Sequence, residues 1–270
     1  MLMSASQEIL HRNNVKVIGN GSTTLILAHG FGCDQNMWRF LTPLLDADFR
    51  IVLFDYVGCG KSDLSAYKKQ RYQNLAGYAE DVEEILSALN VVDAIFVGHS
   101  VSSVIGMLAS YKIPERFSKL VMICPSPCFL NLPQDYFGGF EREDLEELIN
   151  LMDKNYIGWA NYLAPLVMGD NNSPELTREL TSSFCSTDPK FAKPFAKATF
   201  FSDHRSALDK LEHPTLILQS SNDSLASVDI GHYMQNKIRQ STMEIIQAYG
   251  HCLHMTRPSI VADKIRTFCC

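Results

Sequence analysis

The stretch Ala94-Ile95-Phe96-Val97-Gly98-His99-Ser100-Val101-Ser102 decides the fold class of this chain. Four apolar residues lead into Gly98, and a pattern of apolar residues at helical spacing begins just after Ser102. A serine between a buried strand and a helix is typical of the sharp turn that projects the serine oxygen from the carboxyl edge of a parallel sheet. The motif departs from G-x-S-x-G because Ser102 replaces the second glycine. Serine is small, so we expect the turn to form.

Apolar runs that resemble the one before Gly98 recur along the chain, each closed by polar residues, glycine or proline. They lie at 25–28, 51–54, 120–123, 215–218 and 243–246. Runs of this length, apolar on both faces, are typical of buried parallel strands. Helical spacing of apolar residues lies between them, at 78–89 and 104–108, and again at 260–268. The alternation predicts an α/β fold, with a mostly parallel central sheet flanked by helices on both faces.

One segment interrupts this alternation. No strand-like run occurs from about Leu132 to about Phe200, where the sequence instead predicts helices at 141–153, 157–168, 174–184 and 189–199. We expect a helical lid at 132–200, inserted between a first core part at 1–131 and a second at 201–270. Each aromatic residue of this segment, taken singly, is expected to build the lid's own core. As a set, some should line a cavity beneath it.

Bulk properties exclude several classes of protein. The net charge of −6 comes without a basic patch, which argues against nucleic acid and anionic membranes as partners. No apolar run reaches 18 residues and the first 14 residues lack a signal-peptide core, so we expect neither a membrane span nor secretion. Eight cysteines without a C-x-x-C pair predict buried free thiols in a reducing cytoplasm.

Two motifs imitate cofactor or metal sites. Gly58-Cys59-Gly60-Lys61-Ser62 ends like a phosphate-binding loop, but Asp55 stands where that motif needs glycine. Cys124 and Cys128 flank two prolines without an accompanying histidine cluster, so they do not predict a metal site. We therefore expect no cofactor and no metal.

Three side chains form the expected catalytic constellation, with Ser100 as the nucleophile. In hydrolases built on this turn, the acid and the base follow the serine in the order Asp, His, each after a later strand. Asp223 follows the run at 215–218, and His251 follows the run at 243–246. His251 would take the serine proton, and Asp223 would hold the imidazole in the required tautomer. Asp203, Asp229 and His254 are alternatives with poorer placement, and His99 is expected to be structural.

Two backbone N–H groups are expected to stabilise the oxyanion. One belongs to Val101, the residue after the nucleophile, and the other to Phe31 in His29-Gly30-Phe31-Gly32, which follows an early strand. The alternative for this second segment is an ordinary strand-ending turn.

Several segments together resemble one family, and the resemblance runs nearly end to end. They are Phe31-Gly32-Cys33-Asp34-Gln35, Asp55-Tyr56-Val57-Gly58, Gly98-His99-Ser100-Val101-Ser102, Gly138-Gly139-Phe140-Glu141, Asn155-Tyr156-Ile157-Gly158-Trp159 and Gly250-His251. The chain is thus similar to the RsbQ-like α/β-hydrolases, which comprise the bacterial energy-stress regulator RsbQ and the plant karrikin and strigolactone receptor hydrolases. Val101-Ser102-Ser103 looks more like the plant receptors, and Asp63-Leu64-Ser65-Ala66-Tyr67 more like RsbQ.

This resemblance implies a four-helix lid over a deep apolar pocket for a small hydrophobic ligand. Carried over by position, the pocket-lining residues are Phe31, Phe129, Phe140, Trp159, Leu163 and Phe200. It further implies a slow serine hydrolase of small esters or lactones that also serves as a signal receptor. Its partner would be a PAS-domain phosphatase like RsbP, or another signalling protein bound through the lid. The alternatives are a plain metabolic carboxylesterase and, because fold does not fix function, cofactor-free chemistry other than hydrolysis.

Overall fold

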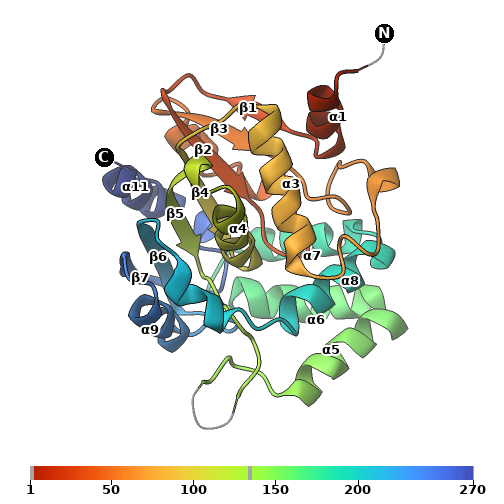
Figure 1. The fold of residues 1–270 in the computed structure, drawn as a ribbon. Coiled ribbons are helices and arrows are strands. Elements are labelled where there is room, and N and C mark those ends of the chain that lie inside the picture. The colour runs from red at the N-terminus through yellow and green to blue at the C-terminus, as the bar shows by residue number, and fades with distance from the viewer. Residues whose placement is uncertain (1–2, 133–135, 270) are drawn as a thin grey trace.

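The computed structural model describes residues 3–132 and 136–269 (Figure 1). Residues 133–135, near the start of the expected insertion, lie outside the described residues, as do residues 1, 2 and 270. Within the described ranges, no helix is long and apolar enough to cross a membrane.

A seven-stranded sheet forms the centre of the described chain, in the order β1-β3-β2-β4-β5-β6-β7. Only β1 runs antiparallel to its neighbour, and the other neighbouring pairs are parallel. The strands are β1 (Lys16–Ile18), β2 (Thr23–Ala28), β3 (Phe49–Leu53), β4 (Ala94–His99), β5 (Phe117–Ile123), β6 (Thr215–Asn222) and β7 (Ser241–Tyr249). The carboxyl ends of the parallel strands therefore meet at one edge, which is where the sequence places its candidate site.

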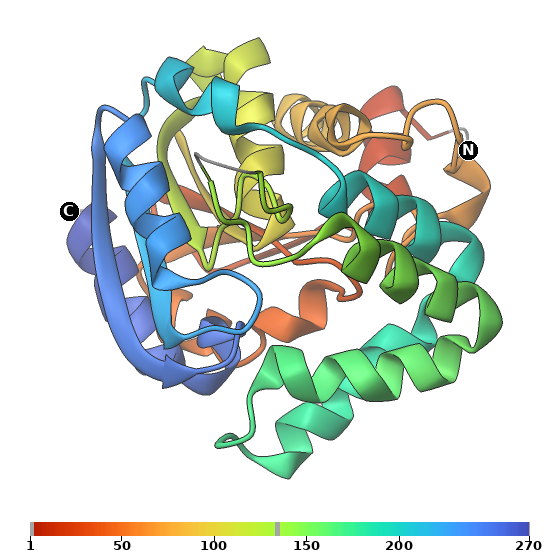
Figure 2. The same ribbon diagram turned by 90° about the horizontal axis from the view of Figure 1, so that it is seen from below.

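Helices cover both faces of the sheet. The structure has α1 (Ala5–Arg12), α2 (Thr42–Leu45), α3 (Leu75–Ala88), α4 (Val101–Lys112), α9 (Val228–Lys237), α10 (Leu253–Thr256) and α11 (Pro258–Cys269). In Figures 1 and 2, α3 and α4 lie side by side on one face of the sheet, and α11 lies on the other. The predicted α/β architecture is confirmed.

Four further helices separate β5 from β6 in the chain and gather at one end of the sheet (Figure 1). They are α5 (Arg142–Lys154), α6 (Tyr156–Met168), α7 (Pro174–Ser186) and α8 (Pro189–Phe200), and we call them the lid. The sequence predicted each of them to within two residues. Proline occupies the first position of α7 and α8, where its missing N–H leaves no helical bond unmade.

Three sequence expectations need correction. The run at 243–246 was expected to be buried on both faces, but β7 is an edge strand, and Ile245 is 43% exposed. The short strand β1 and the helices α1, α2, α9 and α10 were not predicted. Strand β1 has three residues, none of them buried, so it carries no apolar run. Finally, Cys185 is exposed and Cys269 is only partly buried, although buried thiols were expected.

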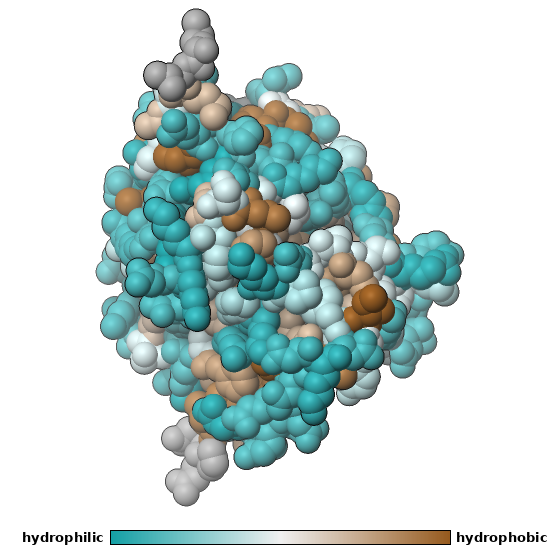
Figure 3. Space-filling view, turned by 90° about the vertical axis from the view of Figure 1, so that its right-hand side faces the viewer, coloured by the Kyte–Doolittle hydropathy of each residue, from teal (hydrophilic) through white to brown (hydrophobic). Residues whose placement is uncertain are grey.

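The outer surface is mostly hydrophilic on the face shown in Figure 3, with hydrophobic residues in separate small patches. The large apolar side chains instead fill one continuous core, which extends from the sheet into the lid. Trp38 and Trp159 are both completely buried in it, on the sheet side and the lid side respectively. The lid is therefore packed onto the sheet as part of the same core.

Candidate active site

Ser100 occupies the turn between β4 and α4. Its backbone has φ 56° and ψ −123°, a left-handed conformation that side chains rarely adopt and that costs about 1–3 kcal/mol. The turn requires glycine at position 98. A Cβ there would lie 2.5 Å from the carbonyl group of Ser102, so a side chain would prevent the close approach of the two segments. The structure thus forms the sharp strand–turn–helix that the sequence predicted, with the serine 6% exposed.

Ser102, which replaces the usual second glycine, is tied into the site by its side chain. Its Oγ donates to the carbonyl oxygen of His29 at 2.5 Å and lies 3.0 Å from the Tyr56 hydroxyl. The larger residue therefore leaves the turn intact and links it to the chain that follows β2 and β3.

A continuous chain of hydrogen bonds joins three side chains from separate strand ends. His251 Nε2 lies 2.7 Å from Ser100 Oγ, and His251 Nδ1 lies 2.7 Å from Asp223 Oδ2. Asp223 follows β6 and His251 follows β7, so the parallel sheet brings them to the same edge as Ser100. In such an arrangement the imidazole can accept the hydroxyl proton while the carboxylate stabilises the resulting cation.

Asp223 is held as a carboxylate. Burial alone would raise its pKa, but the charge of and hydrogen bond to His251, together with two backbone donors, keep the pKa below its usual value. The donors are the N–H groups of Leu225 and Ala226, which reach Asp223 Oδ1 at 2.9 and 3.1 Å. Both oxygens of the carboxylate are therefore engaged.

The alternative residues lie in other settings. Asp203 pairs with Arg205 near the surface, and Asp229 lies in the first turn of α9. His254 is completely buried, 4.4 Å from the His99 ring between ring centroids, and neither of its nitrogens has a hydrogen-bond partner among the described residues. None of the three takes part in the hydrogen-bond chain at Ser100.

His99 supports the loop that carries His251. Its Nε2 donates to the His251 carbonyl oxygen at 2.9 Å, and the opposite side of its ring lies against Gly30, where a Cβ would come within 2.5 Å of Nδ1. Burial, with the nearby His251 charge, lowers the pKa of His99 to about 3. The ring is thus neutral at ordinary pH, consistent with the structural role expected for it.

The two backbone N–H groups expected to stabilise the oxyanion belong to residues that follow β4 and β2. Val101 is the first residue of α4, so its N–H has no acceptor within the helix. Phe31 lies in the turn after β2, which His29 fastens by accepting a hydrogen bond from Tyr56 N at 3.3 Å and donating from Nδ1 to Gly30 O at 2.9 Å. The turn expected to supply Phe31 is therefore held in place by its neighbouring imidazole.

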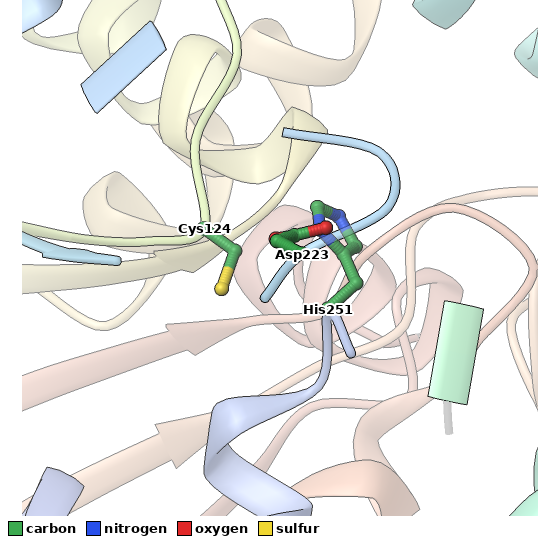
Figure 4. A group of neighbouring side chains, drawn as sticks. All are labelled: Cys124, Asp223 and His251. Atoms are coloured by element: carbon green, nitrogen blue, oxygen red, sulfur yellow. The ribbon is translucent and has the colours of Figure 1, made fainter. Parts of the chain in front are cut away.

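Cys124 lies near Asp223 and His251, with their potential ligand atoms all within 4.8 Å of one another (Figure 4). This group does not fit a metal site. Both nitrogens of His251 are engaged with Asp223 and Ser100, and burial raises the pKa of the Cys124 thiol well above its usual value. A protonated thiol is a poor ligand. The hydrogen bonds of His251 to Asp223 and Ser100 explain why these side chains lie close together.

A narrow enclosed pocket lies between Ser100 and the lid. Its free volume is about 20 Å³, which is room for roughly one water molecule. The lining residues are Phe31, Cys33, His99, Ser100, Phe129, Leu163, Val167, Leu180, Phe184, Thr199, Phe200, Leu225, His251 and Cys252. The space is therefore too small for an ester unless some of the lining side chains move.

Four of the six expected pocket residues line this space, namely Phe31, Phe129, Leu163 and Phe200. The other two lie elsewhere. Trp159 is completely buried behind the pocket, 5.9 Å from the Phe31 ring between centroids, and Phe140 lines a separate groove outside α5 and α6. Sequence reasoning missed six lining residues, of which Leu225 and Cys252 stand within two residues of Asp223 or His251. The others are Cys33, Val167, Leu180 and Thr199.

The outer groove has a free volume of about 910 Å³ and lies along α5, α6 and the loop after β6. Leu163 and Leu225 line both this groove and the enclosed pocket. These two leucines are therefore the partition between the serine and an open surface.

The carboxyl end of α6 is bonded to the two loops that carry Asp223 and His251. The backbone N–H of His251 donates to the carbonyl oxygen of Val167 at 2.7 Å, and Ser224 Oγ donates to that of Leu166 at 2.6 Å. Gly250 permits this contact, because a Cβ there would lie 1.9 Å from the Met168 carbonyl oxygen. Two of the last carbonyls of α6, those of Leu166 and Val167, thus receive their hydrogen bonds from the loops of the site.

Comparison with known proteins shows the family of this chain. A family model described as "alpha/beta hydrolase fold" matches residues 23–258. The solved structure of olei00960, a hydrolase from Oleispira antarctica, is 57% identical with a TM-score of 0.96 and covers 99% of this chain and 98% of its own. A probable esterase of Oryza sativa subsp. japonica is 40% identical, covering 92% of each chain. The karrikin insensitive 2 receptor IA of Petunia hybrida is 39% identical, covering 91% of this chain and 90% of its own. The chain belongs to the α/β-hydrolase family.

Proposed function

We propose that this protein is a serine hydrolase that cleaves a small hydrophobic ester or lactone through Ser100, His251 and Asp223. The observation that supports it is the hydrogen-bonded chain from Asp223 through His251 to a serine held at a strained, left-handed turn. Strain of this kind persists where the surrounding structure fixes it, and it is common at reactive side chains. The similarity to a probable esterase fits the same reaction.

The reaction would proceed in two steps. Ser100 Oγ attacks the carbonyl carbon while His251 Nε2 takes the hydroxyl proton, and that proton then passes to the leaving alcohol as the acyl-enzyme forms. Water next attacks the acyl-enzyme, His251 again accepting and returning a proton, so that the acid is released and Ser100 is restored. The N–H groups of Val101 and Phe31 would carry the oxyanion in both steps.

The chemistry of the pocket supports an apolar substrate. Most of its lining consists of phenylalanine, leucine and valine, and its two cysteines are buried thiols whose pKa is raised, Cys33 to about 12, chiefly by burial. Because some of the lining side chains must move before any ester enters, we expect turnover to be slow.

Replacement of Ser100 by alanine tests the assignment. We expect hydrolysis of p-nitrophenyl acetate to fall at least about 10⁴-fold with no loss of thermal stability, because only the nucleophile is removed. Ser110→Ala is the matched control, since Ser110 is also buried on α4 and donates to the Met107 carbonyl oxygen. Near-normal turnover by Ser100→Ala would refute the proposal.

A second proposal is that hydrolysis serves ligand sensing. It rests on the similarity to a protein named as a karrikin receptor, and on the bonds between α6 and the loops of Asp223 and His251. By these bonds a ligand at Ser100 would alter the lid, where a signalling partner, such as a PAS-domain phosphatase like RsbP, would bind. A plain metabolic carboxylesterase is the alternative. Pull-down with and without a hydrolysed ester decides between them, since a lid that recruits no protein in either state favours the plain esterase.

A further inference from the structure

Thr199 is the unusual polar residue of the enclosed pocket. It lies near the end of α8, lines the pocket that contains Ser100 and is 2% exposed. Its hydroxyl oxygen Oγ1 is buried and has no hydrogen-bond partner among the described residues. A buried hydroxyl without a partner destabilises the fold by about 1–3 kcal/mol, so its position calls for an explanation in terms of what the pocket binds.

Helical threonines ordinarily satisfy this hydroxyl locally, by donating to the carbonyl oxygen four residues earlier. Thr181 on the neighbouring lid helix α7 does so, with its Oγ1 2.9 Å from the Thr177 carbonyl oxygen. Thr199 makes no such bond. Its hydroxyl therefore remains available on the lid side of the pocket.

The other polar groups of the lining are engaged, except His99 Nδ1, which lies against Gly30. Ser100 and His251 bond to each other, and His99 Nε2 donates to the His251 backbone. The remaining lining residues, all within the described chain, are apolar side chains and two buried thiols. Apart from Ser100, Thr199 carries the one hydroxyl in this lining, and it stands on the lid helix rather than on the sheet.

We propose that Thr199 determines substrate specificity by hydrogen bonding to a second polar atom of the substrate, remote from the carbonyl that Ser100 attacks. This inference rests on the proposed function and narrows it. The substrate class becomes small, largely apolar esters or lactones that carry a further oxygen, as an ether, carbonyl or hydroxyl, in the part that points to the lid. Substrate analogues that lack the second oxygen should react less well, because the buried Thr199 hydroxyl then has no hydrogen-bond partner.

Matched ester pairs test this inference. We would use p-nitrophenyl esters whose acyl chain carries an ether oxygen at successive positions, each paired with the all-carbon ester of equal length, such as methoxyacetate with butyrate. The readout is the ratio of kcat/KM, oxygen ester over carbon ester, in the wild-type protein and in Thr199→Val. Comparing ratios between the two proteins cancels the intrinsic reactivity of each ester.

For at least one oxygen position, we expect Thr199→Val to lower this ratio about three- to tenfold, the size of one hydrogen bond. Thr199→Ser, which keeps the hydroxyl, should retain the wild-type ratio. Thr181→Val, which removes a satisfied lid hydroxyl, should retain it as well. The melting temperature of Thr199→Val should not fall, because valine removes an unpaired polar group and keeps the shape.

Other outcomes overturn the inference. An unchanged ratio at every oxygen position would show that the hydroxyl does not meet the substrate. A fall in melting temperature without a change of ratio would assign Thr199 a purely structural role. In both cases Ser100-dependent hydrolysis would persist and the proposed function would stand. If the wild-type protein hydrolysed none of these esters, the proposed function and this inference would fail together.

Discussion

The two walls of the enclosed pocket are built by different means. On the sheet side, Ser100, His251 and Asp223 are fixed by a strained turn and by hydrogen bonds of 2.7 Å. On the lid side, Phe184 and Phe200 are held by packing, with Phe184 5.3 Å from the Trp159 ring and Phe200 5.6 Å from the Phe31 ring between centroids. Directional bonds fix the reacting atoms, whereas non-directional packing fixes only the size and shape of the space.

This difference predicts how each wall responds to change. A substitution on the sheet side should abolish chemistry while leaving stability nearly intact. A substitution on the lid side should lower stability and change which esters are accepted. The following experiments test that division.

The largest effect is expected from Asp223→Asn. The amide cannot hold His251 in the tautomer that accepts the Ser100 proton, so kcat should fall about 10⁴-fold. Asp203→Asn and Asp229→Asn are the controls, since neither residue contacts His251, and both should retain activity within a few-fold. Equal losses in all three variants, measured with p-nitrophenyl acetate, would remove Asp223 from the catalytic group.

On the lid side, Phe184→Ala should cost about 3–5 kcal/mol of unfolding free energy, because Phe184 is 2% exposed. The space opens onto the pocket that Phe184 lines, so kcat/KM for bulky esters should rise relative to acetate. Phe195→Ala is the matched control: Phe195 is as deeply buried but does not line the pocket, and it stacks on Tyr78. It should lose similar stability in urea and keep the wild-type ester preference.

The smallest effect concerns pH. The pKa of His254 lies well below its usual value. Burial is the main cause, and the charges of His99 and His251 lower the pKa further. A folded pKa below the unfolded value of about 6.5 means that the unfolded chain binds the proton first. Stability should therefore decline as pH falls below about 6.5, and not above it. His254→Leu should flatten this decline in melting temperature, and the exposed His11→Gln should not. An identical slope in wild type and His254→Leu would contradict the assignment.

The sequence predicted much of the sheet wall because its signals are local. A buried strand, a small-residue turn and a polar residue after each later strand suffice to bring Ser100, Asp223 and His251 to one edge. It predicted the lid helices for a similar reason, since their apolar spacing is periodic. Neither prediction requires knowledge of how distant side chains pack.

The residues that line the pocket could be predicted only in part. Trp159 and Phe140 are aromatic residues of the lid region like Phe200, and no local signal tells which of them faces Ser100. That choice depends on how α5 to α8 pack on the sheet and on each other. The free hydroxyl of Thr199 is likewise invisible in sequence, because most helical threonines bond to their own helix.

The hydrogen bonds at the end of α6 have a mechanical consequence. The carbonyl oxygens of Val167 and Leu166 accept hydrogen bonds from the loops of His251 and Asp223, so these loops and the carboxyl end of α6 are bonded together as one joint. Entry of an ester that moved this joint would draw the base away from Ser100 and stop the reaction. If the protein hydrolyses esters as proposed, a productive opening of the lid must leave this end of α6 in place, and the rate of hydrolysis should then report on the position of α6.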